Sequence, residues 1–199
     1  MRRVSFSLAL TLLAAFVYYY VSFELAAAFV CAAAAHELGH LLVLRFFGAK
    51  IRSLSFDLCG ANIEYYGDLR AFEHITAALA GPLAGLVYAL AASAFASRSG
   101  LAAPELSAGI SLLLSGFNLL PAMPLDGGNA ARRVFCAVLG DERGTGCAEA
   151  LGLSVSIIVF AAGACAAIRE KGFALLALGF WLIIYQSDTR GLVKNHRLL

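Results

Sequence analysis

The stretch LAAAFVCAAAAHELGHLLVLRFF, residues 25–47, places ionisable side chains inside a segment that is otherwise almost entirely apolar. His36 and His40 are four residues apart, so on a helix both imidazoles leave the same face one turn apart. Two such nitrogens can reach one Zn²⁺ at about 2.0–2.1 Å. Glu37 can then act as the general base toward a metal-bound water. This HExxH pattern predicts a zinc-hydrolase centre. The alternative is that His36, Glu37 and His40 serve only as hydrogen-bond partners between helices. The apolar segment disfavours this, because ionisable residues inside the membrane are costly.

The composition is that of a membrane protein along the whole chain. Of the 199 residues, 61% are hydrophobic and 14% are charged, with a mean hydropathy of +0.81. Soluble domains average about 25% charged residues. We therefore expect one transmembrane domain over residues 1–199. The net charge of +2 gives no indication of a nucleic-acid partner. Five cysteines without CxxC spacing do not indicate a disulfide framework.

Six apolar segments are long enough to suggest membrane helices, since about 20 apolar residues cross a bilayer. They lie at about 4–23, 25–47, 71–96, 101–120, 147–168 and 173–185. We expect the first to be a retained helix and not a cleaved signal peptide, because no clear cleavage site follows it. The fold predicted is an all-α polytopic membrane protein, with a catalytic core over about 25–133 and accessory helices at about 4–23 and 147–187.

The basic residues predict how the chain is oriented. If the N-terminus is cytosolic, twelve Lys and Arg residues fall on the cytosolic side and only Arg98, Arg169 and Lys171 fall outside. Cytosolic loops of membrane proteins carry such an excess of positive charge. We expect a multi-pass protein of a bacterial cell membrane with both termini in the cytosol.

Two regions do not have the pattern of membrane helix. Residues 52–65 alternate apolar and polar on both sides of Gly60, which predicts a β-hairpin between the second and third helices. Its edge could pair with an extended substrate or serve only as a cytosolic cap. In residues 118–129, Pro121 and Pro124 interrupt a helix just before Asp126. Irregular backbone at membrane depth is tolerated where it lines a cavity or is buried in protein.

A third zinc ligand is needed, because catalytic zinc sites usually have three protein ligands and a water. His74 and His196 are candidates, and Asp126 is a stronger one because it follows an apolar helix within irregular backbone. Asp-Gly is also a common turn dipeptide, so residue chemistry alone leaves the role of Asp126 open.

The depth of each residue in the membrane favours Asp126. His40 precedes Lys50 by ten residues, and Asp126 precedes Arg132 by six. With the orientation above, both fall in the cytosolic half of the bilayer, and ligands of one metal must share a depth. The sequence therefore predicts a site built from His36, His40 and Asp126.

Two linked motifs give the chain a resemblance to the site-2 protease family of intramembrane zinc metalloproteases. HELGH at 36–40 matches the HExxH of that family, and NLLPAMPLDG at 118–127 matches its NxxPxxxxDG. A weaker match is AGPL at 80–83. The resemblance implies one Zn²⁺ per chain held by His36, His40 and Asp126, with Glu37 as the base. It also implies that Asn118 positions substrate or stabilises the oxyanion, although an asparagine amide can equally join helices.

The resemblance also implies a function and partners. The expected reaction is hydrolysis of a peptide bond in a membrane-associated or transmembrane protein substrate, releasing a transcription regulator, within the lipid bilayer and under a regulatory membrane protein. The layout is most similar to the sporulation branch, which processes pro-sigma-K; we expect no CBS domain here, since the chain ends soon after the sixth segment. The alternatives are an intramembrane metal transporter and an inactive substrate-binding relative. A prenyl-protein protease is disfavoured because Glu73, Glu105 and Glu149 form no second motif.

Overall fold

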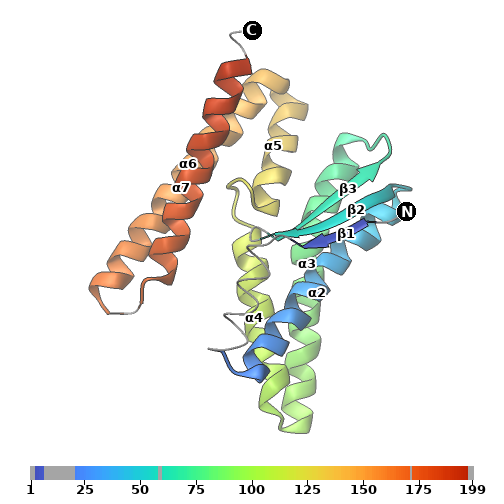
Figure 1. The fold of residues 1–199 in the computed structure, drawn as a ribbon, viewed down its shortest axis with the longest axis vertical. Helices are drawn as coiled ribbons and strands as arrows, with labels where there is room; N and C mark the ends of the chain where they lie inside the picture. Colours follow the sequence, from blue (N-terminus) through green and yellow to red (C-terminus); the bar gives the residue numbers. More distant parts are fainter. Residues whose placement is uncertain (1–2, 7–20, 58–59, 171, 197–199) are drawn as a thin grey trace. The chain divides into compact units, whose positions relative to one another are not determined.

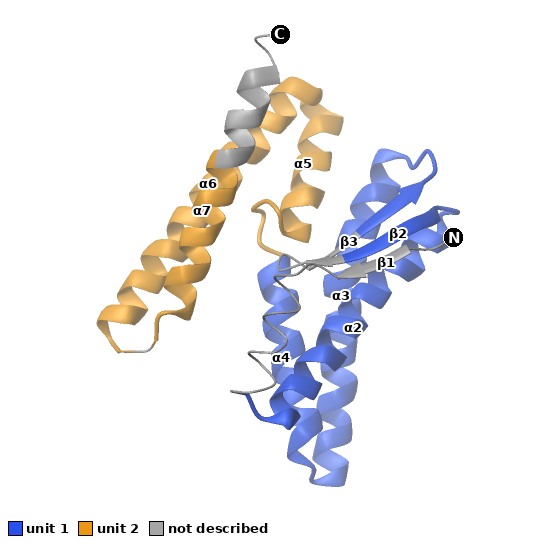
Figure 2. Cartoon of the chain, in the orientation of Figure 1, with its two compact units in different colours: residues 1–118 blue, residues 119–199 orange. Residues whose placement is uncertain are grey.

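The computed structural model describes residues 3–6, 21–57, 60–170 and 172–196 (Figure 1). The chain divides into two compact units, residues 1–118 and residues 119–199, which Figure 2 distinguishes by colour. Within the described residues, the first contains a small sheet and three helices, and the second contains three helices.

Three long helices form the body of the first unit. They are α2 (Phe23–Phe46), α3 (Ala71–Ser99) and α4 (Ala102–Asn118), and each packs against the other two. Helix α2 begins at Ser22, whose hydroxyl accepts a hydrogen bond from the Leu25 amide at 3.4 Å. A side chain on Gly39 would overlap the Ala80 carbonyl, so α2 and α3 approach closely at this glycine. Small residues at helix contacts permit this close approach in membranes.

A three-stranded sheet lies beside these helices. Its strands β1 (Arg3–Phe6), β2 (Lys50–Asp57) and β3 (Gly60–Tyr66) occur in that order, with β2 and β3 antiparallel. The predicted hairpin between the second and third helices is therefore confirmed. Strand β1 pairs parallel with β2 and aligns Val4 with Leu54.

The start of the first predicted membrane helix is wrong. Residues 3–6 form β1 instead. The alternation of polar and apolar residues in Arg-Val-Ser-Phe suits a strand, and these residues pair with the edge of β2. The other residues of the predicted segment at 4–23 lie largely outside the described residues, since 7–20 are not described.

The second unit contains α5 (Asp126–Leu139), α6 (Asp141–Ile168) and α7 (Ala174–His196). Helices α6 and α7 run side by side as an antiparallel pair, and α5 packs against α6 (Figure 1). Gly140, with a φ of 81°, separates α5 from α6. This positive φ favours glycine and allows the sharp change of direction between the two helices.

The helices have the length and composition of membrane spans. Among the described residues, α2, α3 and α6 are long and apolar enough to cross a bilayer, with mean hydropathies of 1.6, 1.8 and 2.3 over their most apolar stretches. The first part of α7, Ala174–Ser187, is a shorter apolar helix. Large apolar side chains such as Leu42, Leu90 and Ile158 are exposed, as expected for surfaces that face lipid. The predicted class, an all-α polytopic membrane protein with a small hairpin, is confirmed.

Candidate metal centre

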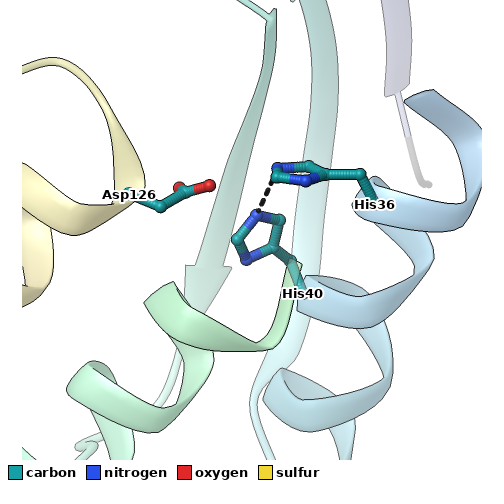
Figure 3. Close-up of side chains that lie close together, drawn as sticks. All are labelled: His36, His40 and Asp126. Carbon is teal, nitrogen blue, oxygen red and sulfur yellow. Dashed lines mark hydrogen bonds between the residues drawn. The ribbon is translucent and has the colours of Figure 1, made fainter. Parts of the chain in front are cut away.

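The two motif histidines converge on one side of α2. The Nε2 atoms of His36 and His40 lie 3.2 Å apart, and the two rings meet edge to face with their centroids 4.9 Å apart (Figure 3). His36 is only 5% exposed, and His40 is partly buried. Two buried imidazole nitrogens therefore face each other within an apolar helix, at the spacing that the i, i+4 pattern predicts.

Helix α3 fixes the orientation of the His40 ring. Its Nδ1–H donates a hydrogen bond of 2.8 Å to the backbone carbonyl of Ala77. A proton on Nδ1 leaves the lone pair of a neutral imidazole on Nε2, the atom that faces His36. A side chain on Gly81 would overlap the His40 ring, so the glycine leaves the space that the ring occupies. Hydrogen bonds of this kind orient metal-binding histidines in proteins.

The histidine pair fits a zinc ion. Two ligands at about 2.0–2.1 Å from a tetrahedral metal lie about 3.3–3.4 Å apart. The observed Nε2 to Nε2 distance of 3.2 Å is close to this value. Imidazole nitrogens are common zinc ligands, and the orientation of His40 by Ala77 is the arrangement expected around such a ligand.

The segment before α5 folds back onto its first turn and so sets the position of Asp126. A side chain on Gly127 would overlap the Leu119 carbonyl, and one on Gly128 would overlap the backbone of Ala122. The Asn129 amide donates to the Pro124 carbonyl at 3.2 Å, and the Met123–Pro124 peptide bond is cis. The irregular backbone predicted for 118–129 is therefore confirmed only over 119–125, since α4 continues to residue 118 and α5 begins at residue 126.

Asp126 is the first residue of α5, directly after the N-cap residue Leu125. Its carboxylate is partly buried. The histidines belong to the first unit and Asp126 to the second.

The remaining predicted residues lie at defined positions on the helices. Glu37 is half-buried on α2 beside the pair. Asn118 is the last residue of α4, and its amide Nδ2 donates to the Leu114 carbonyl at 3.1 Å within its own helix. His74 is hydrogen-bonded to the Tyr65 hydroxyl, and His196 ends α7. Among the described residues, His74 is not part of any cluster able to hold a metal.

One contributor to the site could not be predicted from residue types. The Ala77 carbonyl orients His40, but any residue offers a backbone carbonyl, so alanine at this position carries no signal. Gly81 is different, because a glycine beside Pro82 in an apolar helix is unusual and points to a close approach.

The chain is similar in sequence to proteins named as zinc metalloproteases. No protein-family model matches the chain. It is 30% identical over 159 residues to sll0528 of Synechocystis, which is provisionally named a zinc metalloprotease; the match covers 75% of this chain and 40% of that protein. It is 30% identical over 138 residues to the zinc metalloprotease MJ0392 of Methanocaldococcus jannaschii, covering 64% of this chain and 39% of that protein. The chain thus spans about 40% of the length of the curated relatives it matches.

The fold also matches a solved structure. A site-2 protease from Methanocaldococcus jannaschii superposes with a TM-score of 0.67 at 21% identity, covering 91% of this chain and 85% of that one. The chain therefore has the fold of a site-2 protease, and it is similar in sequence to proteins named as zinc metalloproteases.

Proposed function

We propose that this chain is an intramembrane zinc metalloprotease of the site-2 protease family. The observation that carries the proposal is the pair of imidazole Nε2 atoms 3.2 Å apart on an apolar helix, with His40 already oriented by the Ala77 carbonyl. Such a pair suits a zinc ion. The fold and the names of similar proteins support a protease over other zinc enzymes.

One Zn²⁺ per chain is held by His36, His40 and Asp126. A carboxylate is an ordinary third zinc ligand, and three protein ligands leave one position for water. A bound zinc supplies a Lewis acid that acidifies its water and polarises a carbonyl.

Glu37 is the general base. It follows His36 on α2, so its carboxylate is rotated by about 100° from that ligand while staying at the same level of the helix. From there it takes a proton from the attacking water and returns it to the leaving amine. Asn118 stands at the C-terminal end of α4. Its amide stabilises the developing oxyanion when it turns from the Leu114 carbonyl toward substrate.

The substrate is a membrane-associated or transmembrane protein, and its cleavage releases a transcription regulator, as in pro-sigma-factor processing. The predicted excess of basic residues on one side favours cytosolic termini and a site that opens toward the cytosol. The chain acts as one transmembrane protease domain, with a catalytic core at about 25–133 and further helices around it. A regulatory membrane protein controls access to the site.

Zinc content and cleavage together test the proposal. The wild-type chain, His36→Ala, Asp126→Ala and Glu37→Gln are purified, and zinc is measured by mass spectrometry. We expect about one zinc in the wild type and in Glu37→Gln, and a large loss in the two ligand variants. Co-expression with pro-sigma factors of the source organism should show cleavage by the wild type alone. A full zinc content in Asp126→Ala would show that Asp126 is not a zinc ligand. Zinc flux across proteoliposomes without cleavage would favour a transporter.

A further inference from the structure

The hairpin is attached to the start of α3 next to the histidine pair. The Tyr65 hydroxyl on β3 and His74 Nδ1 on α3 are hydrogen-bonded at 2.9 Å. His74 precedes Ala77 by three residues, less than one helical turn, so both move with the same segment of α3. Ala77 is the residue whose carbonyl accepts the hydrogen bond from His40. A short, continuous path of contacts therefore leads from β3 to a proposed metal ligand.

An apolar cluster provides a second connection along the same path. Leu44, Ala49 and Ala77 are buried together, at 4%, 6% and 7% exposure, and Ile63 and Tyr65 of β3 pack against them. Leu44 lies four residues after His40, so both side chains leave the same face of α2. The cluster holds α2, α3 and β3 together one turn from the proposed ligand. Ala77 belongs to both connections, through its side chain and through its carbonyl.

We propose that Tyr65 and His74 are positioning residues for the metal ligand His40. Their hydrogen bond fixes β3 against α3, so that the Ala77 carbonyl stays in line with His40 Nδ1 and Nε2 stays directed at the metal. The inference rests on the proposed function, because it assumes a metal on the histidine pair. It adds that the hairpin helps to form the metal site, whether or not the hairpin also contacts substrate.

The expected size of the effect follows from the length of the path. Loss of a direct hydrogen-bond partner of a metal ligand typically lowers metal affinity by about 10–100-fold. Tyr65 acts one contact further away, so we expect its loss to weaken affinity by about three- to tenfold, at or below the lower end of that range. A residue that merely anchors the hairpin would lower stability and leave metal affinity unchanged.

The test compares two adjacent tyrosines of β3. Tyr65→Phe removes only the hydroxyl that reaches His74. Tyr66→Phe is the matched control, since its side chain is 58% exposed and lies on the other face of the strand, with the Arg52 guanidinium 5.4 Å from its ring centroid. Zinc affinity is measured by chelator competition on the full chain in nanodiscs, and the visible spectrum of the Co²⁺ form reports ligand geometry. We expect three- to tenfold weaker zinc binding and altered Co²⁺ bands for Tyr65→Phe, and no change for Tyr66→Phe.

Changes at the partner residue complete the test. His74→Leu should reproduce the loss, and the double variant Tyr65→Phe/His74→Leu should lose no more than either single variant. His74→Asn should retain affinity, because its Oδ1 takes the place of Nδ1 and accepts from the Tyr65 hydroxyl. Wild-type affinity in Tyr65→Phe would overturn the inference, as would an equal loss in Tyr66→Phe, which would indicate a general loosening of the hairpin. A wild-type chain that binds no zinc would instead refute the proposed function itself.

Discussion

His40 and Ala77 are joined by a hydrogen bond of 2.8 Å from the imidazole Nδ1 to the backbone carbonyl, across the contact between α2 and α3. Four residues after Ala77, Gly81 leaves the space that the same ring fills. One face of α3 therefore does two things for the proposed metal ligand. It holds the proton on Nδ1, and it admits the ring close enough to α3 for Nε2 to meet that of His36.

Gly81→Ala should disable the metal site without unfolding the chain. The added methyl group would overlap the His40 ring, so the ring must leave its hydrogen bond with Ala77 or α3 must move away from α2. We expect zinc affinity to fall by at least about tenfold, the effect typical of losing such a partner. Gly109→Ala is the control, because its methyl group would meet no atom within 4 Å. Wild-type zinc affinity in Gly81→Ala would show that the ring is not confined by α3.

Gly128→Ala tests how Asp126 is positioned within the second unit. A methyl group at this position would overlap the backbone of Ala122, which cannot turn aside as a flexible side chain can. The first turn of α5 must then shift, at a cost of about 1–3 kcal/mol for overpacking. We expect reduced zinc content and reduced cleavage. Gly146→Ala, in open space on α6, should match the wild type in both measurements. Full zinc content in Gly128→Ala would mean that the packing of Gly128 on Ala122 does not determine the position of the Asp126 carboxylate.

The sequence allows the histidine pair to be predicted because periodicity determines it: four residues on a helix return to one face. The hairpin can also be predicted from neighbouring residues, since the alternation of apolar and polar side chains specifies its two strands. The start of helix α5 could not be predicted from its own residues. Its first turn contains Gly127 and Gly128, which have low helix propensity and read as a turn. The helix starts there because both glycines pack on the preceding segment, a tertiary contact that no residue pattern reveals. The strand β1 likewise depends on pairing with distant β2.

Metal removal and substitution of the base should separate binding from chemistry. A zinc chelator should abolish cleavage by the wild type, and added Zn²⁺ should restore it, because the Lewis acid is then available again. Glu37→Gln should retain zinc but lower kcat by about 10²–10⁴-fold, the range for loss of a general base. The measurement is zinc content beside cleavage rate for the same preparations. Cleavage that survives complete metal removal would contradict a metalloprotease, and an active Glu37→Gln would assign the base to another group.

Two serines on the same face of α4 should respond oppositely to removal of the hydroxyl. Ser107 Oγ donates to the Ala28 carbonyl of α2 at 3.1 Å and is hydrogen-bonded to the Tyr88 hydroxyl of α3 at 2.7 Å, so it joins α2, α3 and α4. Ser115 Oγ is fully buried against Gly85 and has no hydrogen-bond partner among the described residues.

Ser107→Ala should therefore destabilise the chain by about 0.6–1.7 kcal/mol, which are the average and the maximum found for hydrogen bonds between membrane helices. It also removes a hydrogen-bond partner of the partly buried Tyr88 hydroxyl, which favours the upper part of that range. Ser115→Ala should be neutral or stabilising, because it removes a buried polar group that makes no bond. Thermal unfolding of both variants in one detergent gives the comparison. A destabilised Ser115→Ala would show that its hydroxyl bonds to something in the membrane-embedded protein, most simply the Ser111 carbonyl one turn earlier on the same helix.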